Sequence, residues 1–299
     1  MNESLQKSRT ALVLGGGGST GNAWLIGVVA GLFEAGLDVT HADLIIGTPA
    51  GSTAAAQITC APMDELLALT LVAPEQRAAP VGRGGAPAPR GPVPDQLERM
   101  TRMIASSSNA DEYRRSLCAA ALERDAESDG AFTTRWRSMV APRLPRPDWP
   151  DQRMLITAVD ARTAEGVVFD RDSGIELVDA VAASTSSGLP FFIGGTPYLD
   201  GGFRTNAENA DLAGGYERVL VLSPFGGRSL VPAEWGTHLS TQVDALRDGG
   251  SVVETLFPES EVEHLFGPNG MDLSLRPAAA RAGHAQGTAR AEQLAGFWP

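Results

Sequence analysis

The stretch from Leu12 to Gly51 constrains the fold more than any other part of this chain. An apolar run at 11–14 stops at a glycine-rich segment, 15–21, and a helical pattern follows from about residue 22 to residue 34. A second apolar run, 44–46, ends in Gly47-Thr48-Pro49-Ala50-Gly51. Two strands that each break into glycine, with a helix between them, predict a βαβ unit whose loops share one rim of a parallel sheet. In open α/β sheets, ligands bind at that rim.

The turn at 47–51 resembles the nucleophile elbow of serine hydrolases, G-x-S-x-G, which lifts a serine above the sheet. Gly47 and Gly51 stand at the two glycine positions, and Pro49 stands where the serine should be. Proline has no hydroxyl and fixes φ near −65°, whereas an elbow nucleophile sits at positive φ. We therefore predict a relaxed turn in which Thr48 is the helix N-cap and Pro49 is the first helical residue.

The rest of the chain alternates further strand and helix patterns. It predicts strands at 154–159, 167–169, 219–222 and 252–256, a strand end at 198–202, helices at 52–59, 63–71, 95–140 and 177–183, and a last helix opened by Pro277. We expect one α/β domain over 1–299, with a helical insertion to about 145. The Pro/Gly-rich segment 74–94 is either a mobile lid loop or an inert linker.

Composition disfavours several classes of partner. The formal net charge of −12 argues against nucleic acid or an anionic membrane surface. No signal peptide or apolar run of spanning length is evident, so we expect a cytoplasmic protein. Cys60 and Cys118 fit free thiols. His41, His238, His264 and His284 show no metal-ligand spacing, so neither a metal, another cofactor nor a Ser-His-Asp triad is predicted.

Three motifs in order resemble the patatin-like phospholipase family. They are the glycine loop Gly16–Gly21, the elbow Gly47–Gly51, and the turn Asp200-Gly201-Gly202, about 150 residues later. The resemblance covers most of the chain and implies a three-layer α/β/α fold. In that fold a central, mostly parallel sheet carries helices on both faces. It also implies an acyl hydrolase that uses a serine–aspartate dyad.

The family's site maps onto this chain position by position. The resemblance implies an oxyanion hole from the backbone N–H groups of Gly16, Gly17 and Gly18, and makes Asp200 the base of the dyad. Its nucleophile position is Pro49, within an elbow formed by Gly47, Thr48, Ala50 and Gly51. Many members carry Arg or Lys where this chain has Thr20, so the role of that cation in anchoring the loop is in doubt.

The expected function is acyl hydrolysis of a lipid or small ester, absent or strongly impaired because Pro49 replaces the nucleophile. Either a natural pseudoenzyme that binds acyl ligands or regulates, or a serine-replaced variant of an active enzyme, fits the sequence. A dinucleotide-binding oxidoreductase is a third possibility, because Gly16-x-Gly18-x-x-Gly21 satisfies the dinucleotide fingerprint. However, the second strand does not end in an acidic residue. We interpret the hydroxyls of Thr48, Ser52 and 184–187 as caps or turn residues. The acyl chain length and the oligomeric state stay open.

Overall fold

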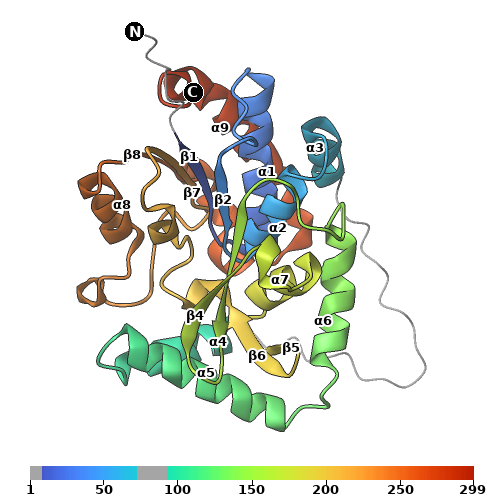
Figure 1. Ribbon diagram of the computed structural model, residues 1–299, viewed down its shortest axis with the longest axis vertical. Coiled ribbons are helices and arrows are strands. Elements are labelled where there is room, and N and C mark those ends of the chain that lie inside the picture. Colours follow the sequence, from blue (N-terminus) through green and yellow to red (C-terminus); the bar gives the residue numbers. More distant parts are fainter. Residues whose placement is uncertain (1–8, 73–92) are drawn as a thin grey trace.

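The computed structural model describes residues 9–72 and 93–299, and its centre is an eight-stranded sheet (Figure 1). The strand order is β5-β6-β3-β2-β1-β7-β8, and β4 also pairs with β3. The strands are β1 (Thr10–Leu14), β2 (Leu44–Gly47), β3 (Met154–Asp160), β4 (Glu165–Phe169), β5 (Phe191–Ile193), β6 (Thr196–Asp200), β7 (Arg218–Leu222) and β8 (Val252–Leu256).

The central strands are parallel, and the antiparallel pairs lie on one side of the sheet. β1 pairs in parallel with β2 and β7, β2 with β3, and β7 with β8. The β3–β4, β3–β6 and β5–β6 pairs are antiparallel. The first two strands and the helix between them form the predicted βαβ unit, and the predicted mostly parallel sheet is confirmed.

Helices cover both faces of the sheet, as the sequence predicted. The α-helices are α1 (Gly18–Glu34), α2 (Ala50–Ile58), α3 (Met63–Leu71), α4 (Val93–Ala105), α5 (Ala110–Ala126), α6 (Phe132–Val140), α7 (Leu177–Ser184), α8 (Leu239–Asp248) and α9 (Arg276–Ala295). Side chains alternate along β1, so Leu12 and Leu14 pack on the side of α1, α2, α7 and α9. Ala11 and Val13 pack on the opposite side, toward α8 and the 3₁₀ helix η4 (Ala210–Ala213).

α1 and α9 lie side by side in Figure 1 and approach closely through glycine. A Cβ on Gly27 would lie 2.2 Å from Ala280 O, and one on Gly31 would lie 2.2 Å from His284 O. Gly283 and Gly287 of α9 are equally tight against α1. The glycines at 27 and 31 therefore let the backbones of α1 and α9 come into direct contact. As expected, Pro277 lies in the first turn of α9.

The segment 93–140 is helical, as predicted, and supplies α4, α5 and α6. These helices lie along the lower and right margins of the view in Figure 1, beside β5 and β6. The Pro/Gly-rich stretch 74–92, for which a lid or linker was predicted, lies outside the described residues. The predicted strand 167–169 lies within β4, which pairs with β3.

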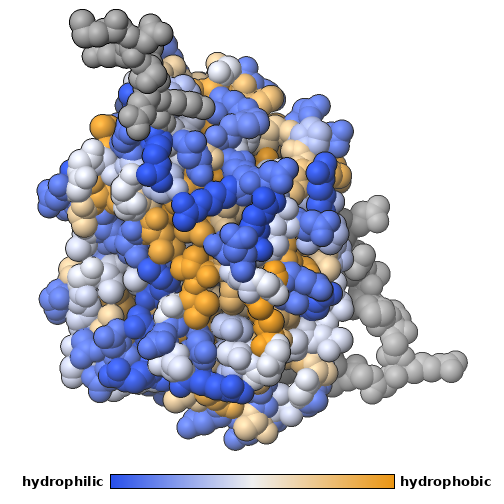
Figure 2. All heavy atoms as spheres, viewed as in Figure 1, coloured by the Kyte–Doolittle hydropathy of each residue, from blue (hydrophilic) through white to orange (hydrophobic). Residues whose placement is uncertain are grey.

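The face shown in Figure 2 is mainly polar, with a few hydrophobic side chains near its middle. Val167 and Val168 of β4 are half-buried. Within residues 9–72 and 93–299, no helix combines the length and the apolar character that a membrane span needs.

Candidate active site

The elbow follows β2 directly. Thr48 and Pro49 connect Gly47, the last residue of β2, to Ala50, the first residue of α2. Gly51 N donates to Thr48 O at 2.8 Å, which closes the turn, and Pro49 O accepts from Ser52 N at 3.1 Å. Thr48 is fully buried, whereas Pro49 is half-buried. The apex of the turn is therefore its accessible point.

The predicted relaxed turn is wrong. Pro49 is the N-cap residue, and α2 begins one residue later than predicted, at Ala50. Thr48 does not cap the helix, because its hydroxyl is engaged elsewhere: Thr48 Oγ1 donates to Glu208 O at 3.2 Å. The same oxygen accepts from Thr157 Oγ1 at 3.2 Å and from Asn209 Nδ2 at 3.1 Å. This buried network and the packing below set the conformation of the turn, against the local preference of Thr-Pro for helix initiation.

The two elbow glycines are required by close backbone packing. A Cβ on Gly51 would lie 1.8 Å from Leu14 O, and one on Gly47 would lie 2.6 Å from Ser52 Cα. Thr48 N also donates to Leu14 O at 3.0 Å. The end of β1 therefore lies directly against the elbow, as the shared rim of the βαβ unit predicted.

The glycine loop presents two free N–H groups rather than three. Gly16 N donates to Ala207 O at 2.8 Å, so this group is not available to a ligand. No acceptor is recorded for the N–H groups of Gly17 and Gly18 among the described residues, as is usual for the start of a helix. Gly18 has φ of 66° and is half-buried. The oxyanion-hole prediction narrows to Gly17 and Gly18.

A distant segment covers one side of this loop. Thr20 N donates to Gly270 O at 3.0 Å, and a Cβ on Gly18 would lie 2.7 Å from the same oxygen. A pyrophosphate would have to sit against this first turn of α1 in a dinucleotide site. β2 ends in Gly47 and is followed by Thr48, so it lacks the carboxylate that would hold a ribose. The contacts of Gly270 with the loop and the lack of a carboxylate after β2 both disfavour a dinucleotide-binding site.

A cation does reach the start of α1, although the loop itself carries Thr20. Arg276, at the start of α9, donates to Ser19 O at 2.8 Å and to Asn22 Oδ1 at 3.1 Å. Thr20 Oγ1 is buried and has no hydrogen-bond partner in the described part of the chain. The positive charge next to the glycine loop thus comes from Arg276, near the C-terminal end of the sequence.

Asp200 abuts the elbow because β2 and β6 share one edge of β3. Ile156 pairs with Gly47 on one side and with Phe169 of β4 on the other. Two residues later, Ala158 pairs with Asp200 on one side and with Val167 of β4 on the other. β4 occupies one edge throughout, so β2 and β6 meet end to end on the other. Two residues span about 7 Å along a strand, and the last residue of β6 therefore lies beside the elbow.

Asp200 is half-buried at the end of β6, and its carboxyl group bonds back to its own turn. Its Oδ1 accepts from Gly202 N at 2.8 Å, within the D-G-G turn. Burial raises the pKa of Asp200 to about 7, although the Gly202 N–H bond opposes this shift. A carboxyl with a pKa near neutrality suits proton transfer better than an ordinary aspartate does.

Sequence reasoning missed the segment Asn206–Asn209, which joins all three motifs. Ala207 O accepts from the glycine loop at Gly16 N, and Glu208 O accepts from the elbow at Thr48 Oγ1. Asn209 Nδ2 donates to Gly201 O of the D-G-G turn at 2.9 Å. The only signal in the sequence is a pair of asparagines shortly after the aspartate, which by itself fits a turn.

Glu208 is a second buried acid at the site. Its side chain is 1% exposed, and its Oε1 accepts from Ser223 Oγ at 2.6 Å. Its Cγ would lie 3.2 Å from a Cβ on Gly15, so it packs against the glycine loop. Burial raises the pKa of Glu208 to about 7, and the Ser223 hydroxyl opposes the rise.

This shift predicts a loss of stability at higher pH. The folded state holds a proton on Glu208 that the unfolded chain has lost above about pH 4.5, so the free energy of unfolding falls from there to about pH 7. Glu208→Gln removes that contribution. In urea denaturation at pH 5 and pH 8 we expect a smaller difference between the two pH values for this variant, by on the order of 1–3 kcal/mol at ~1.4 kcal/mol per pKa unit. Glu123→Gln, at an exposed position on α5, is the control. Identical pH differences in the parent and Glu208→Gln would contradict the assignment.

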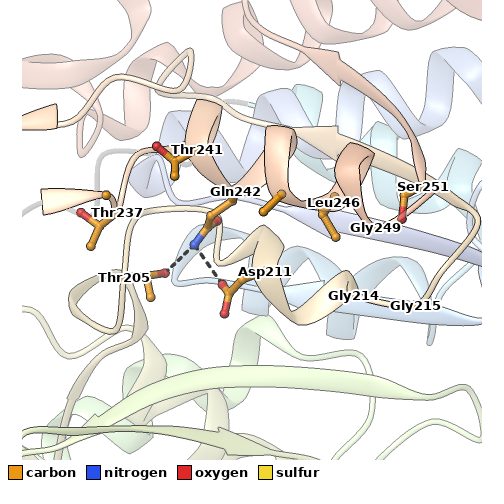
Figure 3. Close-up of a pocket in the computed structure, with 12 residues that line it drawn as sticks. Thr205, Asp211, Gly214, Gly215, Thr237, Thr241, Gln242, Leu246, Gly249 and Ser251 are labelled. Carbon is orange, nitrogen blue, oxygen red and sulfur yellow. Dashed lines mark hydrogen bonds between the residues drawn. The ribbon is translucent and has the colours of Figure 1, made fainter. Parts of the chain in front are cut away.

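A cleft of about 380 Å³ lies between α8 and η4 (Figure 3) and contains none of the predicted site residues. Gln242 Nε2 in its wall donates to Thr205 Oγ1 and to Asp211 Oδ1, each at 3.0 Å. No cluster of three or more His, Cys, Asp or Glu side chains suited to a metal occurs among residues 9–72 and 93–299.

Comparisons with known proteins identify a family for this chain. The family model of the patatin-like phospholipases matches residues 12–212, which include all three motifs. No curated protein matches the chain. The crystal structure of VipD from Legionella pneumophila aligns with 96% of this chain and 67% of that one, with 12% identity and a TM-score of 0.44. The family match covers about two thirds of the sequence, and the chain belongs to the patatin-like phospholipase family.

Proposed function

We propose that this chain is an acyl hydrolase scaffold that retains its oxyanion loop and its base but lacks the attacking atom. As it stands it would bind an acyl ester or lipid-like molecule without forming an acyl-enzyme. The observation that carries the proposal is the meeting of Asp200 and the elbow on one edge of β3, with Pro49 at the accessible apex. The family match supports a hydrolase ancestry.

The chemistry of the complete site needs a hydroxyl at residue 49. A serine oxygen there would attack the ester carbonyl while the Asp200 carboxylate takes its proton, and the N–H groups of Gly17 and Gly18 would stabilise the oxyanion. Collapse would release the alcohol with that proton, and water would then hydrolyse the acyl-enzyme by the same route. Proline offers neither the nucleophile nor the proton, so the first step is missing.

The neighbouring hydroxyls do not replace it. Thr48 Oγ1 is buried and donates to Glu208 O. Ser52 Oγ is also buried and donates back to Pro49 O at 2.7 Å. The four histidines contact groups elsewhere: Asp38, Val231 O, Glu261 O and Glu34. Asp200 would therefore act without a histidine.

Pro49→Ser tests the proposal, with Pro49→Ala as the matched control that removes the ring but adds no hydroxyl. We expect Pro49→Ser to hydrolyse p-nitrophenyl butyrate at least ~10³-fold faster than either the parent or Pro49→Ala, since removal of a nucleophile typically costs more than this. A fluorophosphonate probe should label Pro49→Ser alone. A folded Pro49→Ser protein that neither turns over ester nor reacts with the probe would overturn the proposal, as would ester cleavage by the parent that depends on Asp200.

A further inference from the structure

Asn209 has an unusual backbone for a buried residue. It is 0% exposed and has φ of 54°, and the only other non-glycine residue in the left-handed region within the described part of the chain is Ala164. Asparagine adopts the left-handed conformation more readily than most residues, because its short polar side chain bonds locally. The conformation turns the side-chain amide back toward the three motifs.

The amide nitrogen of Asn209 contacts two of those motifs at once. Its Nδ2 donates to Thr48 Oγ1 of the elbow at 3.1 Å and to Gly201 O of the D-G-G turn at 2.9 Å. Thr157 Oγ1 and Asn206 O lie within 3.4 and 3.2 Å of the same nitrogen. Thr48 precedes residue 49 in the chain, and Gly201 follows Asp200. The Asn209 side chain therefore joins a sequence neighbour of each dyad position.

The carbonyl oxygen of this amide is held by hydrogen bonds on the side away from the elbow. Asn209 Oδ1 accepts from Thr205 Oγ1 at 2.7 Å and from Arg204 Nη1 at 3.1 Å. Arg204 pairs with Asp211 at 2.8 Å. Figure 3 shows Gln242 of α8 pointing between Thr205 and Asp211, with both of its N–H bonds drawn. These contacts leave the amide a single orientation, with its nitrogen toward the elbow.

We propose that Asn209 is a positioning residue that sets the elbow against Asp200. This inference deepens the proposed function and rests on it for its catalytic consequence. A hydroxyl at residue 49 and the Asp200 carboxylate can exchange a proton only within hydrogen-bond reach. Asn209 ties the two turns together through the N–H groups of one amide. Among residues 9–72 and 93–299, no other side chain hydrogen-bonds both the elbow and the D-G-G turn, since Thr157 Oγ1 donates only to the elbow.

Asn209→Gly tests the side chain separately from the backbone, because glycine keeps positive φ without strain. Ser251→Ala is the control: Ser251 Oγ donates to Tyr216 O at 2.6 Å, in a buried place away from the three motifs. The first readout is hydrogen exchange in the parent background, at Gly51 N, which bonds Thr48 O, and at Gly202 N, which bonds Asp200 Oδ1.

We expect Asn209→Gly to speed exchange at least ~10-fold at both amides, and Ser251→Ala to leave both within twofold. Unchanged exchange at either amide, or the same acceleration in Ser251→Ala, would overturn the proposal. This readout needs no turnover, so it decides the role of Asn209 even if Pro49→Ser proves inert, an outcome that would remove the proposed function alone.

If Pro49→Ser is active, the second readout is its kinetics. Adding Asn209→Gly should lower kcat at least ~10-fold and leave KM within twofold, because the groups are misplaced while the acyl contacts remain. A change confined to KM, or an equal fall in kcat when Ser251→Ala is added instead, would show that Asn209 has no positioning role.

Discussion

Gly51→Ala is expected to leave no recoverable folded protein, or to lower the free energy of unfolding by more than ~4 kcal/mol. The new Cβ would lie 1.8 Å from Leu14 O and 2.4 Å from Leu14 C, both backbone atoms of the central strand β1. β1 is held by β2 and β7 on its two edges, so it cannot move aside without breaking the sheet. A loss of this size is a large part of the ~5–15 kcal/mol that stabilises a typical domain.

The control for Gly51→Ala is Gly188→Ala, because a Cβ there has no atom within 4 Å. Urea denaturation of this control should match the parent within ~0.5 kcal/mol, as for most surface substitutions. If Gly51→Ala unfolds at the same urea concentration as Gly188→Ala, the end of β1 does not press on the elbow as described.

The glycine-rich turns in the sequence predicted the fold as much as the apolar strands did. The glycine loop, the elbow and the D-G-G turn each follow an apolar run, and strand ends of a parallel sheet share a rim. The contacts from Gly16 to Ala207 and from Thr48 to Glu208 confirm that these strand ends adjoin. The meeting of β2 and β6 on one edge of β3 could not be predicted, because pairing partners are not encoded by local periodicity.

The conformation of Pro49 was predicted wrongly for a physical reason. Thr-Pro is a good helix start by local preference, but an N-cap hydroxyl must accept a hydrogen bond from the first turn of the helix. Here Thr48 Oγ1 instead accepts from Thr157 Oγ1 and Asn209 Nδ2, which are 109 and 161 residues away in the chain. Tertiary contacts of this kind also explain why Asn209 was missed: its side chain meets residues 8, 52 and 161 positions away. The sequence shows the asparagine but not its partners.

In the Pro49→Ser background, Asp200→Asn is expected to lower kcat/KM by about 10²–10⁴, the usual range for loss of a general base. The amide has nearly the same shape and still accepts from Gly202 N, so the D-G-G turn should persist. The amide is too weak a base to take the proton of the serine hydroxyl. Hydrolysis of p-nitrophenyl butyrate with and without the substitution measures the loss, and equal activity would exclude Asp200 as the base.

The pH profile of Pro49→Ser supplies the stronger test, because a second substitution can separate the titration of Asp200 from that of Glu208. Burial raises the pKa of Asp200 to about 7, and a base acts only when ionised, so kcat/KM should rise with pH up to about 7 and level off above it. Below that point it should fall about tenfold per pH unit. Glu208 has a pKa raised to about the same value, but its Oε1 is bonded to Ser223 and its side chain is 1% exposed. Adding Glu208→Gln should therefore leave the inflection of kcat/KM near pH 7 in place. If that inflection disappears with Glu208→Gln, the titrating group is the glutamate, and the pH profile gives no evidence that Asp200 acts as the base.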